Sequence, residues 1–351
     1  MPEQLTVPAV DRQYSVSYDS VNASEWDEFV LADEEGTFCH LSAWRQVMEQ
    51  VFRHRPYYLS VRNEQGRLAG LLPLVHVRSR LLGNYLMSVP FLNYGGPLGS
   101  DVARAALCAE ATALADRLNV DLLELRSRRT APPGLLCASR KITTVLPLPE
   151  TSEELWEKGF RSKLRSQIRR PIKDGMEVHF GAAEIDPFYQ IFACNMRDLG
   201  TPVLPRRWFA AINDAFPEQV IYAVVYFEGR PVAAGCGFHW RDEFEITWAS
   251  SLREHASRSP NMLLYWSLMQ ECIRRGATKF NFGRSTPGAS THRFKQQWGG
   301  EDFALPWGIW GKKTAPPTPD SAKFALARAV WSRLPLPLAN RVGPVIARQL
   351  P

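Results

Sequence analysis

Cationic side chains gather on one polar stretch near the C-terminal end of the chain, FNFGRSTPGASTHRFKQQWGG (residues 280–300). It carries Arg284, Arg293 and Lys295 beside aromatic residues and follows a short alternating strand. A cation held next to an acyl carbonyl can stabilise the oxyanion of a tetrahedral intermediate, and residues at strand ends often form sites in open α/β sheets. The pattern therefore indicates either a loop that holds an anion or a solvated loop with surface cations.

A second basic cluster, RSKLRSQIRRPIK (residues 161–173), places six cations within thirteen residues. On a helix, Arg161, Arg165 and Arg169 follow one another at intervals of four residues and form a single stripe. Like charges stacked in this way repel, so an anion lying along the stripe would relieve them. The cluster indicates either a phosphate-binding stripe or the solvated basic face of a helix.

Composition sets the broad class of the protein. The 351 residues suffice for two lobes or one large domain, and 45% hydrophobic residues exclude global disorder. A net charge of +6 favours an anionic partner, such as a nucleotide, a phosphorylated lipid, tRNA or a membrane surface. No long apolar run predicts a transmembrane helix, and residues 1–18 lack the features of a signal peptide. We therefore expect a cytoplasmic protein, with contact to the inner membrane as an open alternative.

Common catalytic and ligand-binding signatures are missing from the sequence. The six cysteines are far apart, which predicts small buried hydrophobic side chains in a reducing compartment and no zinc site. P-loop, dinucleotide-binding, nucleophile-elbow and H-E-x-x-H motifs are absent. No recognition helix or stacking sheet is evident, so we expect no DNA-reading function. The sequence therefore predicts neither a metal nor a permanently bound cofactor.

The pattern of helices and strands repeats. Each half has helical patterns, a strand hairpin, more sheet, an amphipathic helix and a further strand. The hairpins EQGRLAG (residues 64–70) and FEGRPVAAG (residues 227–235) are the clearest matching pair. This indicates an internal duplication of an α/β (α+β) unit with mixed sheets flanked by helices. We expect lobes at residues 1–150 and 151–312.

Residues 313–351 differ in character from both lobes. KKTAPPTPD predicts a Pro-rich linker, and the segment after it interleaves aliphatic and aromatic residues with Lys323, Arg328 and Arg333. Two interpretations remain open at this stage. The segment is either a helix packed on the body of the protein or an amphipathic segment that contacts a membrane surface or a partner.

The segment at residues 280–300 resembles the FDFGRS…G…FKxxWG motif of FemAB-related proteins of the exosortase/PEP-CTERM exopolysaccharide loci, within the GNAT-like acyltransferase superfamily. Further segments match in order, among them FCHLSAWRQVMEQVFRHRPYYL, PFLNYGGPLG, LGTPVLPRRWF and NMLLYWSLMQECIRRG. The similarity covers roughly residues 15–310. It implies two tandem GNAT-like lobes, the second acting as the acyltransferase lobe, and it implies transfer of an acyl or aminoacyl group to an amine of a cell-envelope or exopolysaccharide precursor.

The resemblance also implies roles for particular residues. Lys295 occupies the position of the F-K lysine that supports the acyl-transfer intermediate in relatives, and Arg284 is a second catalytic candidate. Apart from the resemblance, two acids are candidates for the base that takes the proton of the attacking amine, Glu245 on the strand EFEITWASS and Asp198 before LGTPV; the alternative is that both are solvated or salt-bridged. Basic side chains would hold the phosphates of the acceptor. The candidate substrate-binding residues are Arg165, Arg169, Tyr94, Gly95, Thr201, Asn261, Ser285, Arg293 and Trp298.

The donor and partners stay open between alternatives. Relatives use aminoacyl-tRNA, while GNAT enzymes use acyl-CoA. The GNAT pyrophosphate loop [RQ]-x-x-G-x-[GA] is missing, and REHASRSPNML (residues 253–263) stands in its place, where a helix N-terminus could meet a phosphate. The expected partner is an anionic small molecule or a lipid-linked precursor. A rival interpretation is a non-catalytic scaffold of exopolysaccharide assembly.

Overall fold

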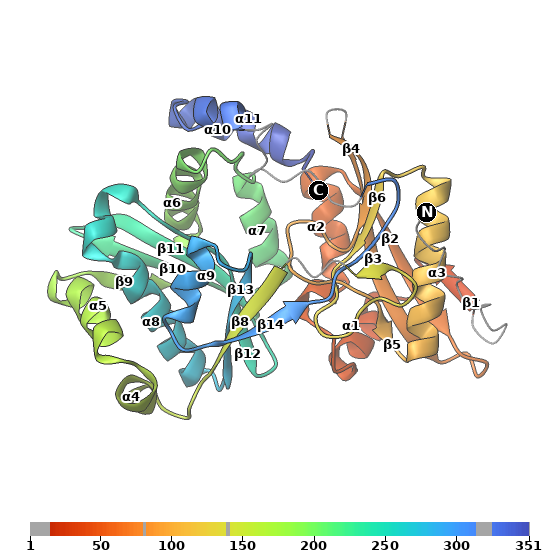
Figure 1. The fold of residues 1–351 in the computed structure, drawn as a ribbon, viewed down its shortest axis with the longest axis horizontal. Coiled ribbons are helices and arrows are strands. Elements are labelled where there is room, and N and C mark those ends of the chain that lie inside the picture. Colours follow the sequence, from red (N-terminus) through yellow and green to blue (C-terminus); the bar gives the residue numbers. More distant parts are fainter. Residues whose placement is uncertain (1–14, 80–81, 138–140, 314–324, 351) are drawn as a thin grey trace. The chain divides into compact units, whose positions relative to one another are not determined.

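The chain folds into two units, each built on one mixed β-sheet with flanking helices (Figure 1). The structure, a computed structural model, describes residues 15–79, 82–137, 141–313 and 325–350. The first unit comprises residues 1–140, 304–317 and 349–351, and the second comprises residues 141–303 and 318–348. The α/β architecture predicted from the sequence is confirmed.

The first unit contains a sheet with strand order β1-β2-β3-β4-β6-β15-β7 among the described residues, with β5 paired to β3. Its helices are α1 (Ala23–Ala32), α2 (Ala43–Phe52) and α3 (Asp101–Arg117), with the 3-10 turn η1 (Phe38–His40). Its strands are β1 (Ser15–Tyr18), β2 (Arg55–Arg62), β3 (Leu68–Ser79), β4 (Gly83–Met87), β5 (Leu98–Gly99), β6 (Leu122–Leu125), β7 (Leu136–Cys137) and β15 (Gly308–Trp310).

The second unit contains a sheet with strand order β14-β8-β13-β12-β11-β10-β9 in the part of the chain that the structure describes. Its strands are β8 (Lys141–Pro147), β9 (Glu177–Phe180), β10 (Val220–Phe227), β11 (Arg230–Trp240), β12 (Glu243–Ser251), β13 (Lys279–Ser285) and β14 (Glu301–Leu305), the last ending just beyond the unit. Its longer helices are α5 (Ser162–Lys173), α6 (Ile185–Asp198), α7 (Arg206–Ala215), α8 (Pro260–Arg274), α10 (Ala325–Trp331) and α11 (Leu336–Ala347). Short helical segments are α4 (Ser152–Glu154), the π-helix η2 (Leu155–Gly159), η3 (Ala182–Glu184), η4 (Arg253–Arg258) and α9 (Ser290–Gln296).

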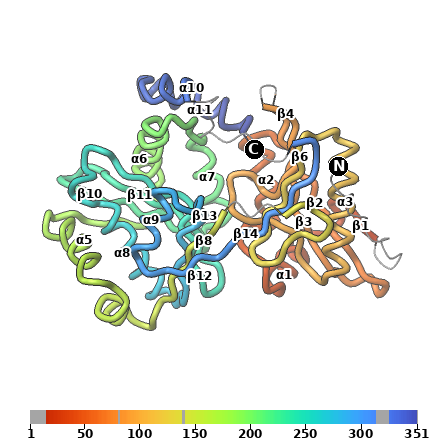
Figure 2. The backbone as a smooth tube through the Cα atoms, in the orientation of Figure 1, coloured from red at the N-terminus to blue at the C-terminus, as the bar shows by residue number. Residues whose placement is uncertain are grey.

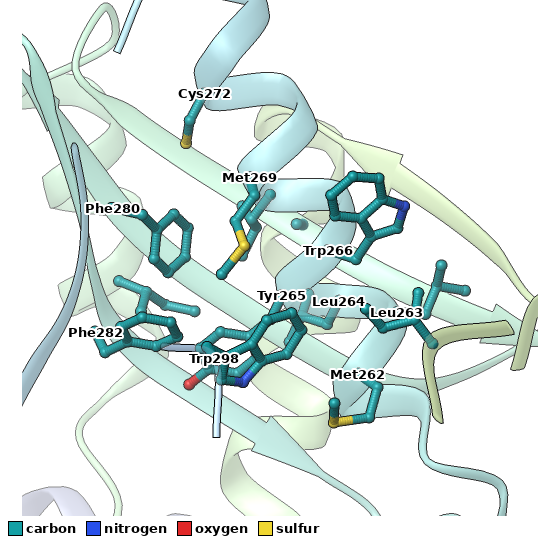
Figure 3. Close-up of a cluster of buried hydrophobic side chains, with 14 of the residues drawn as sticks. Met262, Leu263, Leu264, Tyr265, Trp266, Met269, Cys272, Phe280, Phe282 and Trp298 are labelled. Carbon is teal, nitrogen blue, oxygen red and sulfur yellow. The ribbon is translucent and has the colours of Figure 1, made fainter. Parts of the chain in front are cut away.

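Side chains along the strands alternate between the two faces of the second sheet. Helices pack on these side chains and cover both faces. On one face, Ala223 and Val225 of β10 join the core cluster that includes α8. Figure 3 shows this core, where Tyr265, Trp266 and Met269 of α8 lie beside Phe280 and Phe282 of β13. On the other face, Tyr222 packs against Phe188 of α6 and donates its hydroxyl to the carbonyl of Phe209 in α7. The strands of this sheet are therefore held in place by packed side chains on both faces.

The two units share a local plan that supports the predicted duplication. In the first, β4 and β6 are parallel neighbours in the sheet, and α3 lies between them in the chain. In the second, β12 and β13 are parallel neighbours, and α8 lies between them in the chain. A long hairpin precedes each pair, β2–β3 and β10–β11. The course of the chain through these repeated elements can be followed in Figure 2.

The division of the chain differs from the boundaries expected at residues 150 and 312. β8 lies before residue 150, but it pairs with β13 and therefore belongs to the second sheet. β15 lies before residue 312, but it pairs with β6 and belongs to the first sheet. Each unit thus takes a strand from beyond its expected limit. Pairing between strands far apart in the sequence causes this, and local patterns do not report it.

The C-terminal segment forms two helices, α10 and α11, and α11 packs against α6 (Figure 1). Most of the predicted Pro-rich linker, from residue 314 to 324, lies outside the described residues. Of the cysteines, Cys39, Cys108, Cys236 and Cys272 are buried as expected, whereas Cys137 is exposed. Over the described ranges, no helix is long and apolar enough to cross a membrane.

Candidate active site

A bulge near the end of β13 shapes the backbone of the candidate site. Asn281 lies opposite Val145 of β8 and Arg284 lies opposite Thr143, so three steps on β13 match two on β8. Gly283 adopts a φ of +69°, which is the left-handed region that favours glycine. The N–H of Gly283 donates to Oδ1 of Asn281 at 2.8 Å. The glycine and the asparagine side chain together fix the course of the strand here.

The bulge receives the side chain of Lys295 from α9. Nζ of Lys295 donates to the carbonyl oxygens of Gly283 at 2.7 Å and Arg284 at 3.0 Å. The side chain is 7% exposed. Burial lowers the pKa of Lys295 to about 8; the charge of Glu245 opposes this shift, and that of Arg284 adds to it. The structure therefore places the Lys295 ammonium against the backbone of Arg284, another predicted catalytic residue.

Acidic and amide side chains form a buried polar group on β12 and β13. Nδ2 of Asn281 donates to Oε1 of Glu243 at 2.8 Å and to Oε2 of Glu245 at 3.3 Å. Oδ1 of Asn281 also accepts from the hydroxyl of Thr143 at 2.6 Å. With the bond from Gly283, the amide uses two donors and two acceptors, which fixes its orientation. Asn281 therefore couples two buried carboxylates to the bulge that holds Lys295.

The two parallel strands of the site part directly after this group. β12 pairs with β13 only from Glu243–Lys279 to Glu245–Asn281, although β12 continues to Ser251 and β13 to Ser285. Beyond that point, β12 stays paired with β11, and β13 stays paired with β8. No ladder between β12 and β13 continues past Asn281 in the described part of the chain. The ladder between the two strands therefore ends beside the bulge that holds Lys295.

The position of α9 is set by an imidazole–carboxylate pair. Nδ1 of His292 accepts from the N–H of Gly288 at 3.0 Å, so Nε2 carries the proton that is donated to Asp302 at 2.7 Å. Burial raises the pKa of Asp302, but hydrogen bonds from Thr144, His292 and Gln296 outweigh this effect and leave it below its ordinary value. The pair ties the helix that carries Lys295 to β14.

The arginine stripe has structural roles that its spacing does not reveal. Arg161 precedes α5 as its N-cap residue in an extended conformation. Nη1 of Arg165 donates to the carbonyls of Trp156, Glu157 and Phe160 at 2.8–3.1 Å and so closes the end of the π-helix. The exposed guanidinium of Arg169 lies 5.2 Å from the ring centre of Trp156. Nη1 of Arg165 therefore donates to backbone carbonyls, whereas the guanidinium of Arg169 is exposed.

Trp298, predicted as a substrate contact, is placed in the hydrophobic core. It is 1% exposed and packs near Tyr265, Phe282 and Phe160 with ring centres 5.6–6.2 Å apart (Figure 3). It braces the segment after Lys295 from within the core. Ser285 is also buried, at 5% exposure, and its hydroxyl has no hydrogen-bond partner among the described residues. Ser285 therefore stays a candidate for a ligand contact.

The remaining candidates are spread over the two units. Arg284 and Arg293 are exposed on β13 and α9, and Asn261 is half-buried in the first turn of α8. Thr201 donates its backbone N–H to the carbonyl of Met196 in the turn after α6. The alternative base, Asp198, is paired with its neighbour Arg197 at 2.6 Å.

Within the first unit, Tyr94 is buried, and the guanidinium of Arg128 lies 5.6 Å from its ring centre. Gly95 follows it with a φ of +131°.

Sequence analysis missed Asn281, Glu243 and Thr143. A signal was present for the first two. Asn281 stands between two phenylalanines on a strand, and Glu243 precedes Glu245 by two residues, so the two acids share one face. Thr143 had no such signal, because its strand was not recognised as part of this sheet. Among the described residues, no group of three or more His, Cys, Asp and Glu side chains could hold a metal ion.

Known proteins resemble this chain in part of its sequence and in its fold. Residues 158–296 match the model of the acetyltransferase (GNAT) domain. The UDP-N-acetylmuramoylpentapeptide-lysine N(6)-alanyltransferase of Weissella viridescens is 26% identical over 132 residues, which are 36% of this chain and 38% of that protein. The chain thus matches well under half the length of this curated relative.

Two solved structures resemble the fold over most of the chain. FemX superposes with a TM-score of 0.62 at 13% identity, over 84% of this chain and 96% of FemX. A tandem GNAT protein from the clavulanic acid biosynthesis pathway superposes with a TM-score of 0.51 at 10% identity, over 86% and 100% of the two chains. The chain has a tandem GNAT-like fold of the FemX kind. The part of the second unit that matches the acetyltransferase (GNAT) domain model, residues 158–296, includes Lys295.

We predict that Asn281→Asp strongly destabilises the protein. The substitution places a third carboxyl group beside Glu243 and Glu245 and removes the amide donors that satisfy them. Loss of one donor from each of two buried carboxyl groups, together with a new carboxyl beside them, costs roughly 3 kcal/mol of unfolding free energy at neutral pH. Urea denaturation at pH 7 measures this loss.

The matched control is Asn63→Asp in the β2–β3 turn. Oδ1 of Asn63 only accepts, from the N–H groups of Gln65 and Arg67, so an aspartate keeps both bonds. We expect a change within about 0.5 kcal/mol for this surface substitution. Equal destabilisation by the two variants would contradict the buried polar group.

We also predict that unfolding stability rises with pH as Lys295 deprotonates. Its folded pKa of about 8 lies below the ordinary lysine value of 10.5, so the unfolded chain binds more protons between these pH values. Relative to Lys295→Met, the wild-type protein should gain about 2 kcal/mol of unfolding free energy between pH 7 and pH 10.

Denaturation curves for both proteins across this pH range test the point. The control compares the wild-type protein with Lys163→Met, which removes an exposed lysine of α5, and the difference should stay constant with pH. A constant difference for Lys295→Met as well would show that the Lys295 ammonium is not desolvated.

Proposed function

We propose that the protein is an N-acyltransferase that moves an acyl or aminoacyl group to an amine of a cell-envelope or exopolysaccharide precursor. The observation that carries the proposal is the buried ammonium of Lys295 beside the point where β12 and β13 part. An ammonium has three N–H donors, and the carbonyls of Gly283 and Arg284 accept two. The third N–H is available for a substrate oxygen.

The proposed reaction uses side chains of this protein, an activated donor and an acceptor amine. The acceptor amine attacks the carbonyl carbon of the donor, and the carbonyl oxygen gains the negative charge. Lys295 stabilises that oxyanion by its charge and its third N–H, inside a site with little water. The bond from the carbonyl carbon to the leaving oxygen or sulfur then breaks. We assign the proton of the amine to the carboxylate of Glu245, which accepts from Asn281 beside the bulge, and from there it neutralises the departing oxygen or sulfur.

Two donors fit the site, and each has its own support. The GNAT match and the parting strands favour an acyl-CoA, because an extended amide chain can lie along the exposed edge of a parted strand. The alanyltransferase match and the FemX-like fold favour an aminoacyl-tRNA. In both cases the donor is an activated ester or thioester, so the demands on Lys295 are the same.

The acceptor would be an anionic or lipid-linked precursor that carries an amine. The relative from Weissella viridescens is an alanyltransferase for the lysine of a UDP-linked muramoylpentapeptide, which has this chemistry. The exposed guanidinium groups of Arg169, Arg284 and Arg293 are the cations that we assign to its phosphates. A role in PEP-CTERM exopolysaccharide loci is the narrower form of the same proposal.

We predict that Lys295→Ala lowers turnover by a factor of about 100 to 1,000 with the fold intact, the range for loss of one oxyanion donor. The measurement is the rate of acyl transfer to a muramoylpentapeptide or amino-sugar acceptor, followed by mass spectrometry. Lys279→Ala is the matched control, because this lysine lies on β13 but pairs with Asp242 at the surface. Undiminished turnover in Lys295→Ala would rule out the assignment.

The identity of the donor can be decided before any acceptor is known. A ligand that binds the folded state raises the melting temperature, and the effect grows with its concentration. We expect acetyl-CoA or alanyl-tRNA, but not both, to raise the melting temperature of the wild-type protein. Uncharged tRNA and adenosine diphosphate are the controls. If neither donor stabilises the protein or yields product, the non-catalytic scaffold becomes the better interpretation.

A further inference from the structure

Exposed aliphatic side chains concentrate on the two C-terminal helices. Of the large hydrophobic residues that are exposed in the described part of the chain, five of twelve lie on α10 and α11. They are Leu326, Val330, Leu338, Val342 and Val345, with exposures between 36% and 78%. We call these five residues and the arginines beside them the tail surface. Such a concentration on a short segment marks an interaction site.

The buried side of α11 explains why these residues face outward. Ala339, Gly343 and Ala347 are buried and follow one another at intervals of four residues, so they form one stripe of small side chains. A Cβ atom at Gly343 would lie 3.0 Å from the backbone nitrogen of Val203, so the helix approaches this backbone closely. The small stripe packs inward, which directs Leu338 and Val342 to the opposite side.

The rest of the segment is held by equally close contacts within the second unit. A Cβ atom at Gly200 would lie 2.8 Å from the backbone oxygen of Arg328 in α10. Nη1 of Arg197 donates to the carbonyl of Leu334, between the two helices, at 3.2 Å. Both helices are therefore fixed on the unit, and the tail surface is part of its folded structure.

Arginines flank the aliphatic stripe on α11. At 100° per residue, Leu338, Val342 and Val345 fall within about 60° of arc. Arg341 and Arg348 are exposed and lie at one border of this arc. Arg333 is exposed between the helices. The sequence from Ser321 to Pro351 contains no aspartate or glutamate. The segment is therefore apolar at its centre, cationic at its border and without compensating acid.

We propose that the tail surface docks the protein on an anionic lipid bilayer. An amphipathic helix in the plane of a membrane buries aliphatic side chains among the acyl chains, while arginines meet the phosphates of the head groups. The cationic border and the absence of acid fit this partner by charge. A protein interface would be richer in tyrosine and tryptophan at its centre, whereas leucine and valine are rare among interface hot spots. This inference does not depend on the proposed reaction.

Vesicle flotation with the purified full-length protein tests the proposal. We expect binding to vesicles of phosphatidylcholine with 30% phosphatidylglycerol, and much weaker binding to phosphatidylcholine alone. The double variant Val342→Asp/Val345→Asp should lose at least tenfold in vesicle affinity. Arg341→Gln/Arg348→Gln should lose roughly 30-fold on anionic vesicles, from about 1 kcal/mol per arginine, and little on neutral ones.

Matched controls separate the tail surface from general effects. Leu31→Asp introduces an acid at a similarly exposed aliphatic residue of α1, and Arg170→Gln/Arg230→Gln removes two exposed cations elsewhere. Both controls should bind vesicles as the wild-type protein does, and all variants should keep its melting temperature. Absence of binding by the wild-type protein, equal losses in the controls, or a dimer dissolved by Val342→Asp/Val345→Asp would each overturn the proposal. If the proposed reaction takes place, every variant should acylate a soluble acceptor at the wild-type rate. Failure of the membrane proposal can therefore be told apart from failure of the proposed reaction.

Discussion

The arrangement of the second unit around β13 depends on one constraint, which is the burial of the Lys295 ammonium. A charge taken out of water requires compensating oxygen atoms at hydrogen-bond distance, and here they are the backbone carbonyls of Gly283 and Arg284. A regular strand would direct successive carbonyls to opposite sides, so both can reach one nitrogen only where the strand is distorted. The bulge with a left-handed glycine provides the distortion, and Asn281 holds it in place. Strand, glycine, asparagine and lysine therefore form one interdependent arrangement.

The same burial sets the chemistry that the site can perform. A fully solvated lysine would keep its charge to high pH and would be screened by water. At Lys295 the pKa falls to about 8, yet the side chain remains mostly protonated at neutral pH, in a medium where its charge acts strongly. Glu243 and Glu245 place two carboxyl groups on the neighbouring strand, and the amide of Asn281 donates to both. The cation that α9 supplies to the bulge of β13 and the acids of β12 thus lie near the point where the two strands part.

Sequence patterns were informative where the physical cause is local. The order of elements, the hairpins and the motif around Lys295 and Arg284 follow from short-range periodicity and from a resemblance carried by contiguous residues. They were less informative where the cause is a contact between distant segments. Trp298 looked like a loop aromatic, but it completes a core with Tyr265 and Phe160. Arg165 looked like a phosphate ligand because its spacing is regular, yet the π-helix before it supplies three carbonyls. Thr143 bonds to Asn281 across 138 residues of sequence.

The local sequence pattern of the two C-terminal helices was compatible with two interpretations. Only the structure shows which of their side chains face inward. A helix that only covers the body of a protein would turn its larger aliphatic residues inward and leave small ones outside, since burial of leucine and valine stabilises the fold most. In α11 the small residues Ala339, Gly343 and Ala347 face inward, and Leu338, Val342 and Val345 face outward. Burial within the unit therefore does not account for these three outward-facing residues. Their position is understandable if a second apolar medium lies on the other side, and the arginines beside them indicate the charge of its surface.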